Sequence, residues 1–240
     1  MDMLTRDHFF NGNVVLNQPK SGYRFSIDAV ILSHLVCPAP GETVLDLGTG
    51  CGVIPIMLAF RHPDIQVIGV EIQPSLSILA RQNVADNRMT GRVRIVDKDM
   101  GQLSPADIDG PVDLVVTNPP YRKLDSGRIN ADSQRAVARH ELKTDLETVL
   151  LTARRMLHKS GRFSIIYPSV RTVDLVAAMR STGLEPKTLT MIHSKPASPA
   201  RLVAITGIKG GHPGLEVGPP LHLYHDDGTY TRAVEAMFSA

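Results

Sequence analysis

The sequence predicts an α/β fold in which a mainly parallel sheet is covered by helices on both faces. Short apolar, β-branched segments alternate along the chain with segments whose apolar residues recur at helical spacing, which is typical of repeated strand–helix–strand units. The first strand ends in a glycine-rich turn, as in nucleotide-binding domains. The last two strands follow one another without a helix between them, which favours an antiparallel pair at one edge of the sheet. A chain of 240 residues with 42% apolar residues suffices for one such domain.

The first half of this domain is expected to contain four strands and two helices. Its first helix is expected to stop near Pro63, and Pro74 suits the start of its second, because proline interrupts a helix but is tolerated at the first position. The expected strands are Thr43–Leu47, Gln66–Val70, Val93–Val96 and Val112–Val116, and the expected helices are Val53–Arg61 and Ser75–Asn87.

The second half is expected to contain two helices and three strands. The helices are Asp145–His158, which stops at Ser160-Gly161, and Arg171–Ser181, which stops at Gly183. The strands are Arg162–Tyr167, Leu184–His193 and Ala200–Ile208. We therefore predict a core domain over residues 37–208, an N-terminal extension over residues 1–36 with a helix at Ser26–Val36, and a tail over residues 209–240 that packs on the domain or extends it.

Composition narrows the class of protein only modestly. The formal charge of +2 permits a local basic face for nucleic acid without requiring one. The two cysteines, Cys37 and Cys51, have neither the spacing nor the neighbours of a metal site, so we expect reduced thiols and no metal. No stretch approaches the ~20 apolar residues that span a bilayer. The first ten residues lack the apolar core of a signal peptide, and the expected location is the cytoplasm.

The turn after the first strand reads Asp46-Leu-Gly48-Thr-Gly50-Cys-Gly52. Three glycines at alternate positions allow a sharp turn and a close approach of the backbone to a ligand. The third glycine comes one residue earlier than in dinucleotide folds, and the Asp46 carboxylate would repel a pyrophosphate. A ligand with an ammonium and a sulfonium group suits this carboxylate, so the loop predicts S-adenosylmethionine as the cofactor.

Two further acids follow neighbouring strands. Glu71 ends the second strand, where a carboxylate can accept hydrogen bonds from both ribose hydroxyls. Asp99 follows the third strand and is predicted to accept from the adenine amino group, with Asp97 as a competitor for this role. The adjoining residues Thr49 and Ile72 complete the cofactor-binding set predicted around the loop and the second strand.

The fourth strand ends in Thr117-Asn118-Pro119-Pro120-Tyr121. Two prolines cannot extend a central strand, so they hold a rigid loop. The Asn118 side-chain oxygen and the Pro119 carbonyl can accept both protons of a deactivated amine and direct its lone pair at a methyl group, while Tyr121 offers a ring for base stacking. We predict Asn118, Pro119, Pro120 and Tyr121 as the catalytic set, with Asn118 also next to the cofactor.

These motifs resemble the amino-methyltransferases that carry Asn-Pro-Pro-Tyr. Residues 18–32, QPKSGYRFSIDAVIL, and residues 135–141, RAVARHE, are similar to segments of the bacterial tRNA1(Val) adenine-37 N6-methyltransferase family. The resemblance covers about residues 10–207. It implies a Rossmann-like, seven-stranded class I methyltransferase sheet with a reversed last strand, and a cofactor pocket that the N-terminal extension helps to line through Tyr23, Arg24, Phe25 and Asp28. It also implies a tRNA partner. Six basic residues between Arg122 and His140 fit a phosphate track and a solvated loop that orders on substrate binding equally well.

Other functions stay open at this stage. A carboxamide nitrogen is equally deactivated, so protein-glutamine N5-methylation is an alternative, although that family usually carries a helical N-terminal domain and only a short segment precedes the glycine loop here. Methylation of another nucleic acid or of a small-molecule amine is a further alternative, as is a non-catalytic module that binds S-adenosylmethionine. The sequence does not distinguish a monomer from a homodimer.

Overall fold

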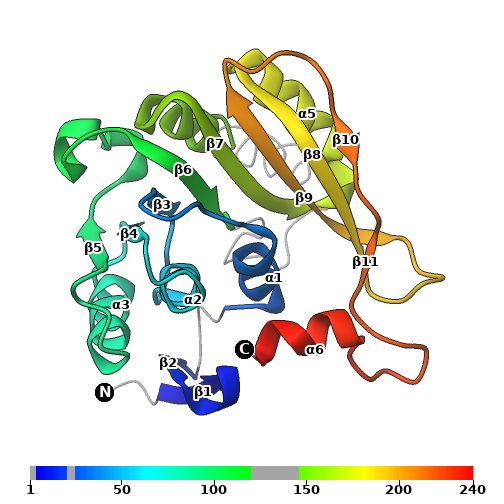
Figure 1. Ribbon diagram of the computed structural model, residues 1–240, viewed down its shortest axis with the longest axis horizontal. Helices are drawn as coiled ribbons and strands as arrows, with labels where there is room; N and C mark the ends of the chain where they lie inside the picture. Colours follow the sequence, from blue (N-terminus) through cyan, green and yellow to red (C-terminus); the bar gives the residue numbers. More distant parts are fainter. Residues whose placement is uncertain (1–3, 21–24, 120–145, 240) are drawn as a thin grey trace, which may run out of the picture.

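The structure is a computed structural model that describes residues 4–20, 25–119 and 146–239 (Figure 1). Its centre is a nine-stranded sheet in the order β10-β8-β9-β7-β6-β3-β4-β5, with β11 also paired to β8. The two shortest strands are β10 Glu216–Val217 and β11 Leu221–His222. The other seven strands are the ones the sequence predicts: β3 Thr43–Leu47, β4 Gln66–Glu71, β5 Val93–Asp97, β6 Val112–Thr117, β7 Leu157–Pro168, β8 Leu184–His193 and β9 Ala200–Lys209. The predicted α/β fold is confirmed.

One strand runs against the others. The pairs β3–β4, β4–β5, β3–β6 and β6–β7 are parallel, whereas β9 is antiparallel to both of its neighbours, β7 and β8. Because β8 and β9 are joined by a short turn, β9 returns between β7 and β8. The reversed last strand is therefore confirmed.

Helices cover both faces of the sheet. On one face lie α1 Ile27–Leu35, α2 Val53–Arg61 and α3 Pro74–Asp86, and on the other lie the helix at residues 146–156 and α5 Thr172–Ser181. Successive strand residues enter different cores, as with Val44 on the first face and Leu45 on the second, because side chains alternate across a strand. No helix in the described part of the chain is long and apolar enough to cross a membrane.

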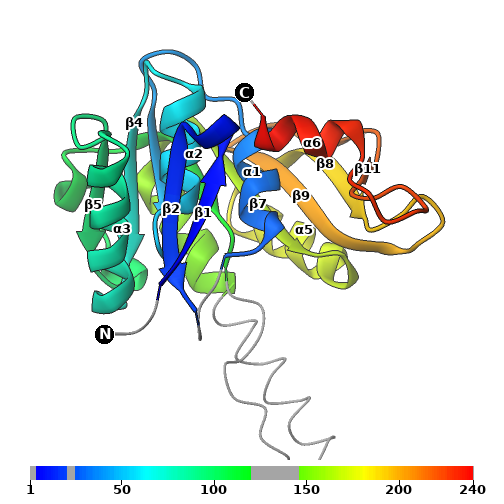
Figure 2. The same cartoon turned by 90° about the horizontal axis from the view of Figure 1, so that it is seen from below.

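The N-terminal extension contains a hairpin that the sequence analysis did not predict. Strands β1 Leu4–Phe9 and β2 Val14–Pro19 form a separate antiparallel sheet, joined by a turn in which Asn11 and Gly12 adopt left-handed backbone angles. Figure 2 shows this hairpin lying across α2 and α3. It therefore covers the helices that flank the glycine loop and adds a layer outside them.

The C-terminal tail attaches at two places. Strands β10 Glu216–Val217 and β11 Leu221–His222 pair in parallel with β8, and helix α6 Arg232–Phe238 packs on α1. Phe238 stacks on Phe9 of the hairpin with ring centroids 5.9 Å apart. The tail thus both extends the sheet and contacts the N-terminal hairpin (Figure 1).

The predicted end of the helix before β7 and the predicted start of β7 are both wrong. The helix predicted to reach His158 ends at residue 156, and β7 starts at Leu157 rather than at Arg162. The register of β6 with β7 shifts between Val112 and Leu114, and Ser160 has a positive φ of 66°, so the Ser160-Gly161 turn signal marks an irregularity within the strand.

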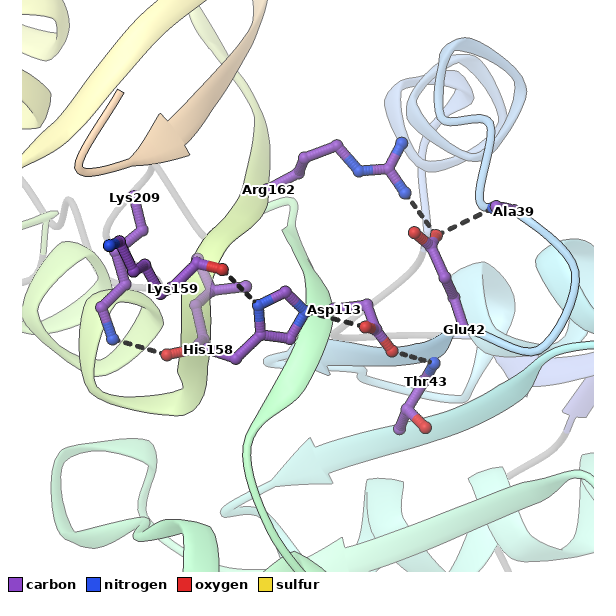
Figure 3. A network of polar contacts seen from close by, with 9 residues as sticks. Ala39, Glu42, Thr43, Asp113, His158, Lys159, Arg162 and Lys209 are labelled. Atoms are coloured by element: carbon purple, nitrogen blue, oxygen red, sulfur yellow. Dashed lines mark hydrogen bonds and ion pairs between the residues drawn. The ribbon is translucent and has the colours of Figure 1, made fainter. Parts of the chain in front are cut away.

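A polar network joins the amino-terminal ends of three strands (Figure 3). The Asp113 carboxylate accepts hydrogen bonds from the Thr43 amide at 2.8 Å and lies 2.8 Å from Nε2 of His158. Arg162 pairs with Glu42 close by. This network lies at the end of the sheet opposite to the edge where the predicted site residues gather.

Candidate functional site

The predicted site residues that follow β3, β4 and β6 lie at the carboxyl edge of the sheet. Strand β3 is flanked by β4 on one side and β6 on the other, and the helices that follow β3 and β6 cover opposite faces. Such a reversal leaves a crevice at the carboxyl ends of the strands, where open α/β sheets bind ligands. The glycine loop, Glu71 and Asn118 all follow strands that end at this edge.

The glycine loop is fixed to the end of β4. Gly48, Gly50 and Gly52 have φ angles of 75°, 57° and 86°, a left-handed conformation that side chains disfavour. The amides of Gly48 and Thr49 both donate to the Val70 carbonyl at 2.9 Å. The loop therefore has the tight form that the alternating glycines predict.

Gly69 of β4 makes room for this loop, and the sequence analysis missed it. A Cβ atom at Gly69 would lie 2.8 Å from Oγ1 and 2.9 Å from Cγ2 of Thr49, closer than real contacts allow. The available signal was a glycine inside a β-branched strand, which often marks a close approach of another segment.

Asp46 is the most unusual charged residue of the site. Its side chain is fully buried, and neither carboxylate oxygen has a hydrogen-bond partner among the described residues. Burial raises the pKa of Asp46 to about 7; the nearby Thr49 hydroxyl opposes this, although it lies outside hydrogen-bonding geometry, and the Glu71 charge reinforces it. A buried carboxylate without a partner is costly, and a cationic ligand removes that cost.

Glu71 is held in place by backbone amides. One carboxylate oxygen accepts from the Gly50 amide and the other from the Gln73 amide, both at 2.9 Å. The residue is 5% exposed, and Ile72 beside it is 61% exposed. The edge thus presents an oriented carboxylate next to an open apolar side chain, the groups needed for a ribose and a base.

The two candidate acids after β5 have different partners. Asp97 forms an ion pair with Arg81 at 2.7 Å and a hydrogen bond with Ser77, so α3 occupies its carboxylate. Asp99 is exposed and caps a short 3-10 helix at Met100–Gln102 by accepting from the Gly101 amide at 2.8 Å. Its contact with an adenine stays a prediction.

Asn118 emerges next to the glycine loop. The Thr117 hydroxyl donates to the Leu47 carbonyl at 2.9 Å, and these two residues are directly paired between β6 and β3. The following residues, Asn118 and Gly48, therefore leave adjacent strands at the same level. The Oδ1 atom of Asn118 is buried and has no hydrogen-bond partner in the described part of the chain.

The remaining predicted site residues lie partly outside the described residues. Pro119 is buried, whereas Pro120 and Tyr121 fall outside the description, as do Tyr23, Arg24 and the basic residues from Arg122 to His140. Phe25 donates its amide to the Gln18 side chain at 3.1 Å and packs against Phe9, and Asp28 lies in the first turn of α1.

These residues fit S-adenosylmethionine. The unpaired Asp46 carboxylate suits a cationic ligand, the left-handed glycines remove side chains from the loop, and Glu71 is oriented for a ribose.

Comparison with known proteins identifies the family of the chain. Residues 27–178 match the family described as methyltransferase small domain. A relative from Pedobacter heparinus, named tRNA1(Val) (adenine(37)-N6)-methyltransferase, is 29% identical over 92% of each chain. A relative of the same name from Porphyromonas gingivalis is 33% identical over 79% of this chain and 76% of its own length.

Solved structures share the fold. A crystal structure described as a predicted O-methyltransferase from Agrobacterium tumefaciens superposes with a TM-score of 0.70 over 88% of this chain and 94% of its own, at 23% identity. A geranyl diphosphate C-methyltransferase from Streptomyces coelicolor, solved with S-adenosyl-L-homocysteine, gives a TM-score of 0.53 at 15% identity and covers 75% of this chain and 76% of its own.

Proposed function

The chain belongs to the methyltransferase small domain family and is an S-adenosylmethionine-dependent methyltransferase, and we propose that its acceptor is the N6 amine of an adenine in tRNA. Relatives named for this activity at adenine 37 of tRNA1(Val) support the substrate, and the same position is the first to test. Because tRNA is the substrate, we also infer a cytoplasmic location.

The chain contributes to the cofactor site mainly through charge and shape. When bound, S-adenosylmethionine supplies a methyl group on a cationic sulfur, which a nucleophile can take without a metal. The buried Asp46 carboxylate stabilises the positive charge of the ligand, and the amide-bound Glu71 accepts from the ribose hydroxyls. The glycine loop brings the backbone close enough for direct contact.

The environment of the Asn118 side chain is the main support for the proposed reaction. Its buried Oδ1 has no partner among the described residues and follows β6 beside the glycine loop. A buried acceptor without a donor is unfavourable, so this oxygen suits an incoming N–H group. Together with the Pro119 carbonyl it would accept both protons of the adenine amine and direct its lone pair toward the methyl group. These hydrogen bonds strengthen as positive charge develops on nitrogen, which favours the transition state.

A labelling experiment tests the acceptor. The protein is incubated with S-adenosylmethionine labelled in the methyl group and, separately, with unmodified bulk tRNA, ribosomal RNA, DNA and a release factor, and each product is digested. We expect label in tRNA as N6-methyladenosine. A tRNA1(Val) transcript with adenine 37 replaced by guanine is the matched control and is expected to stay unlabelled.

The other outcomes identify the alternatives. Label found only in the release factor would replace the proposal with protein-glutamine methylation, and label only in DNA or ribosomal RNA would replace the substrate. Binding of S-adenosylmethionine without label in any acceptor would favour a small-molecule amine or a non-catalytic module.

A further inference from the structure

The buried side chain of Asn83 joins three segments of the chain. It lies on α3 with no exposed surface. Its Nδ2 group donates to the carbonyls of Asn17 in β2 and Cys51 in the glycine loop, both at 2.9 Å, and its Oδ1 accepts from the Asn17 amide at 2.9 Å. Both amide protons and the oxygen are thus used, which ties the N-terminal hairpin and the glycine loop to the same helix.

Asn87, one turn later on the chain, holds the hairpin in the same way but does not reach the loop. Its Oδ1 accepts from the Val15 amide at 2.9 Å, and its Nδ2 donates to the Val15 carbonyl at 2.7 Å. The other Nδ2 contact is with the Asn83 carbonyl of its own helix, also at 2.7 Å. The two asparagines therefore differ in the bond to Cys51, and also in burial, since Asn83 has no exposed surface whereas Asn87 is half-buried.

The hydrogen bond from Asn83 to the Cys51 carbonyl holds the part of the glycine loop between its last two glycines. Cys51 lies between Gly50 and Gly52, whose left-handed backbones have no side chains to hold them. The bonds to Val70 and Glu71 hold the β4 side of the loop. On the α3 side, Gly52 approaches Ala80 so closely that a Cβ atom would lie 3.3 Å from the Ala80 methyl.

We propose that Asn83 is a positioning residue for S-adenosylmethionine binding, which sets the Cys51 carbonyl and thereby the glycine loop against the N-terminal hairpin. The inference rests on the glycine loop being the cofactor site of the proposed function. Asn83 acts through the loop and takes no part in the methyl transfer itself.

The same link extends to the segment that is predicted to line the pocket. Asn17 precedes Gln18, which is 2% exposed and accepts the Phe25 amide through its side chain at 3.1 Å. Displacement of β2 from Asn83 would therefore disturb the start of α1 as well as the loop. Hairpin docking and cofactor binding are coupled through this one side chain.

The test compares Asn83→Asp with Asn87→Asp. Each substitution keeps the side-chain volume and the contact with a β2 amide, but replaces the donor that faces two carbonyls with an acceptor. Both variants are expected to unfold at lower temperature than the wild type. Only Asn83→Asp is expected to weaken S-adenosylmethionine binding in calorimetry, by about tenfold, the size of one lost buried hydrogen bond. At saturating cofactor its kcat should stay within roughly a factor of two of the wild type, while the KM for the cofactor rises.

Hydrogen exchange of the wild-type protein supplies a test that does not depend on a variant folding. Cofactor binding is expected to slow exchange at the Asn17 amide, which Asn83 holds, more than at the Val15 amide, which Asn87 holds. Equal protection of the two amides, an unchanged affinity in Asn83→Asp, or an equal loss of affinity in both variants would overturn the proposal. Failure of the wild type to bind S-adenosylmethionine at all would instead reject the cofactor site of the proposed function.

Discussion

The Thr117 hydroxyl donates a 2.9 Å hydrogen bond to the carbonyl oxygen of Leu47, so that β6 and β3 end level with each other. Both groups are buried, and a buried hydrogen bond of this kind fixes one strand end against the next. Because Gly48 and Asn118 are the next residues along each chain segment, the alignment sets the distance between the cofactor loop and the proposed acceptor site.

Substitution of Asn118 is expected to separate binding from turnover. In Asn118→Ala the acceptor for one adenine proton is lost, so kcat should fall by about a hundredfold or more. The affinity for S-adenosylmethionine should stay close to that of the wild type, because the side chain acts on the acceptor amine. Calorimetry and initial rates measure the two effects. A parallel loss of cofactor affinity would contradict this role and would move Asn118 to the cofactor site.

Asp46 gives the cofactor affinity a dependence on pH. Burial raises its pKa to about 7, so the charged form that pairs with a cationic ligand becomes dominant only above that pH. The affinity of the wild type for S-adenosylmethionine should therefore rise between about pH 6 and pH 8. Asp46→Asn should bind S-adenosylmethionine weakly, and the pH dependence that comes from Asp46 should be absent. Titration of the ligand itself affects both proteins, so the variant corrects for it. Identical pH profiles for the two proteins would show that Asp46 does not titrate in this range.

The same carboxyl group affects the stability of the free protein. A pKa that is raised on folding contributes stability below the unfolded pKa, near 3.8, and this contribution is lost as the pH rises through the folded pKa, about 7. Asp46→Asn should therefore be more stable than the wild type above pH ~7, measured by thermal unfolding without cofactor. A lower stability for the variant at this pH would mean that Asp46 has a partner after all.

Gly69 and Thr49 are expected to depend on each other. Gly69→Ala places a methyl group within 2.8 Å of the Thr49 hydroxyl, so the loop must move and the affinity for S-adenosylmethionine should fall. Adding Thr49→Ala removes both atoms that cause the clash and should restore a large part of the loss. A double-mutant cycle on the dissociation constants measures the coupling, which neighbouring residues typically show at ~0.5–3 kcal/mol. Strict additivity would mean that the methyl group acts through Ile95 instead.

His158 should stabilise the fold only when it is protonated. A hydrogen bond to the Lys159 carbonyl, together with the Asp113 carboxylate, raises the pKa of His158, because only the imidazolium can donate to both. Burial acts to raise the pKa of Asp113, but hydrogen bonds from Thr43 and His158 outweigh it and the pKa is lowered, so the partner stays ionised. The stabilisation is present below about pH 6.5 and is lost as the pH rises through the folded pKa.

Thermal unfolding of His158→Gln tests this. The deficit relative to the wild type should be larger at about pH 5.5 than at about pH 8.5. Methyl transfer should be unaffected at saturating substrates, because the network lies at the amino-terminal ends of the strands, away from the glycine loop and Asn118. A stability deficit of His158→Gln that grows with pH would show that neutral His158, and not the protonated form, stabilises the fold.

The strands of the central sheet were predictable because the signals for them are local. Strand β3 matches its predicted range and β6 differs by one residue, since apolar β-branched runs that end at Gly or Asn need little tertiary information. Strand β8 also matches its predicted range, which starts directly after Gly183. Likewise, the left-handed glycines of the loop follow from their alternate spacing.

The parts that were missed depend on partners far away in the sequence. Strand β1 has five residues with partly or fully exposed side chains before Phe9, so it shows no apolar alternation, although Asn11-Gly12 was an available hairpin signal. Strands β10 and β11 have two residues each and exist only through pairing with β8. Asn83 occupies a buried position on α3, and only the hairpin and the loop together explain a polar residue there.

Strands β10 and β11 cover part of the outer edge of β8. Without these segments β8 would be the last strand of the sheet, with a row of unpaired backbone amides and carbonyls open to other chains. The tail occupies this row at two separate points, and α6 anchors its end on α1. The two short pairings therefore reduce the length of β8 backbone that is open to strand addition by another chain.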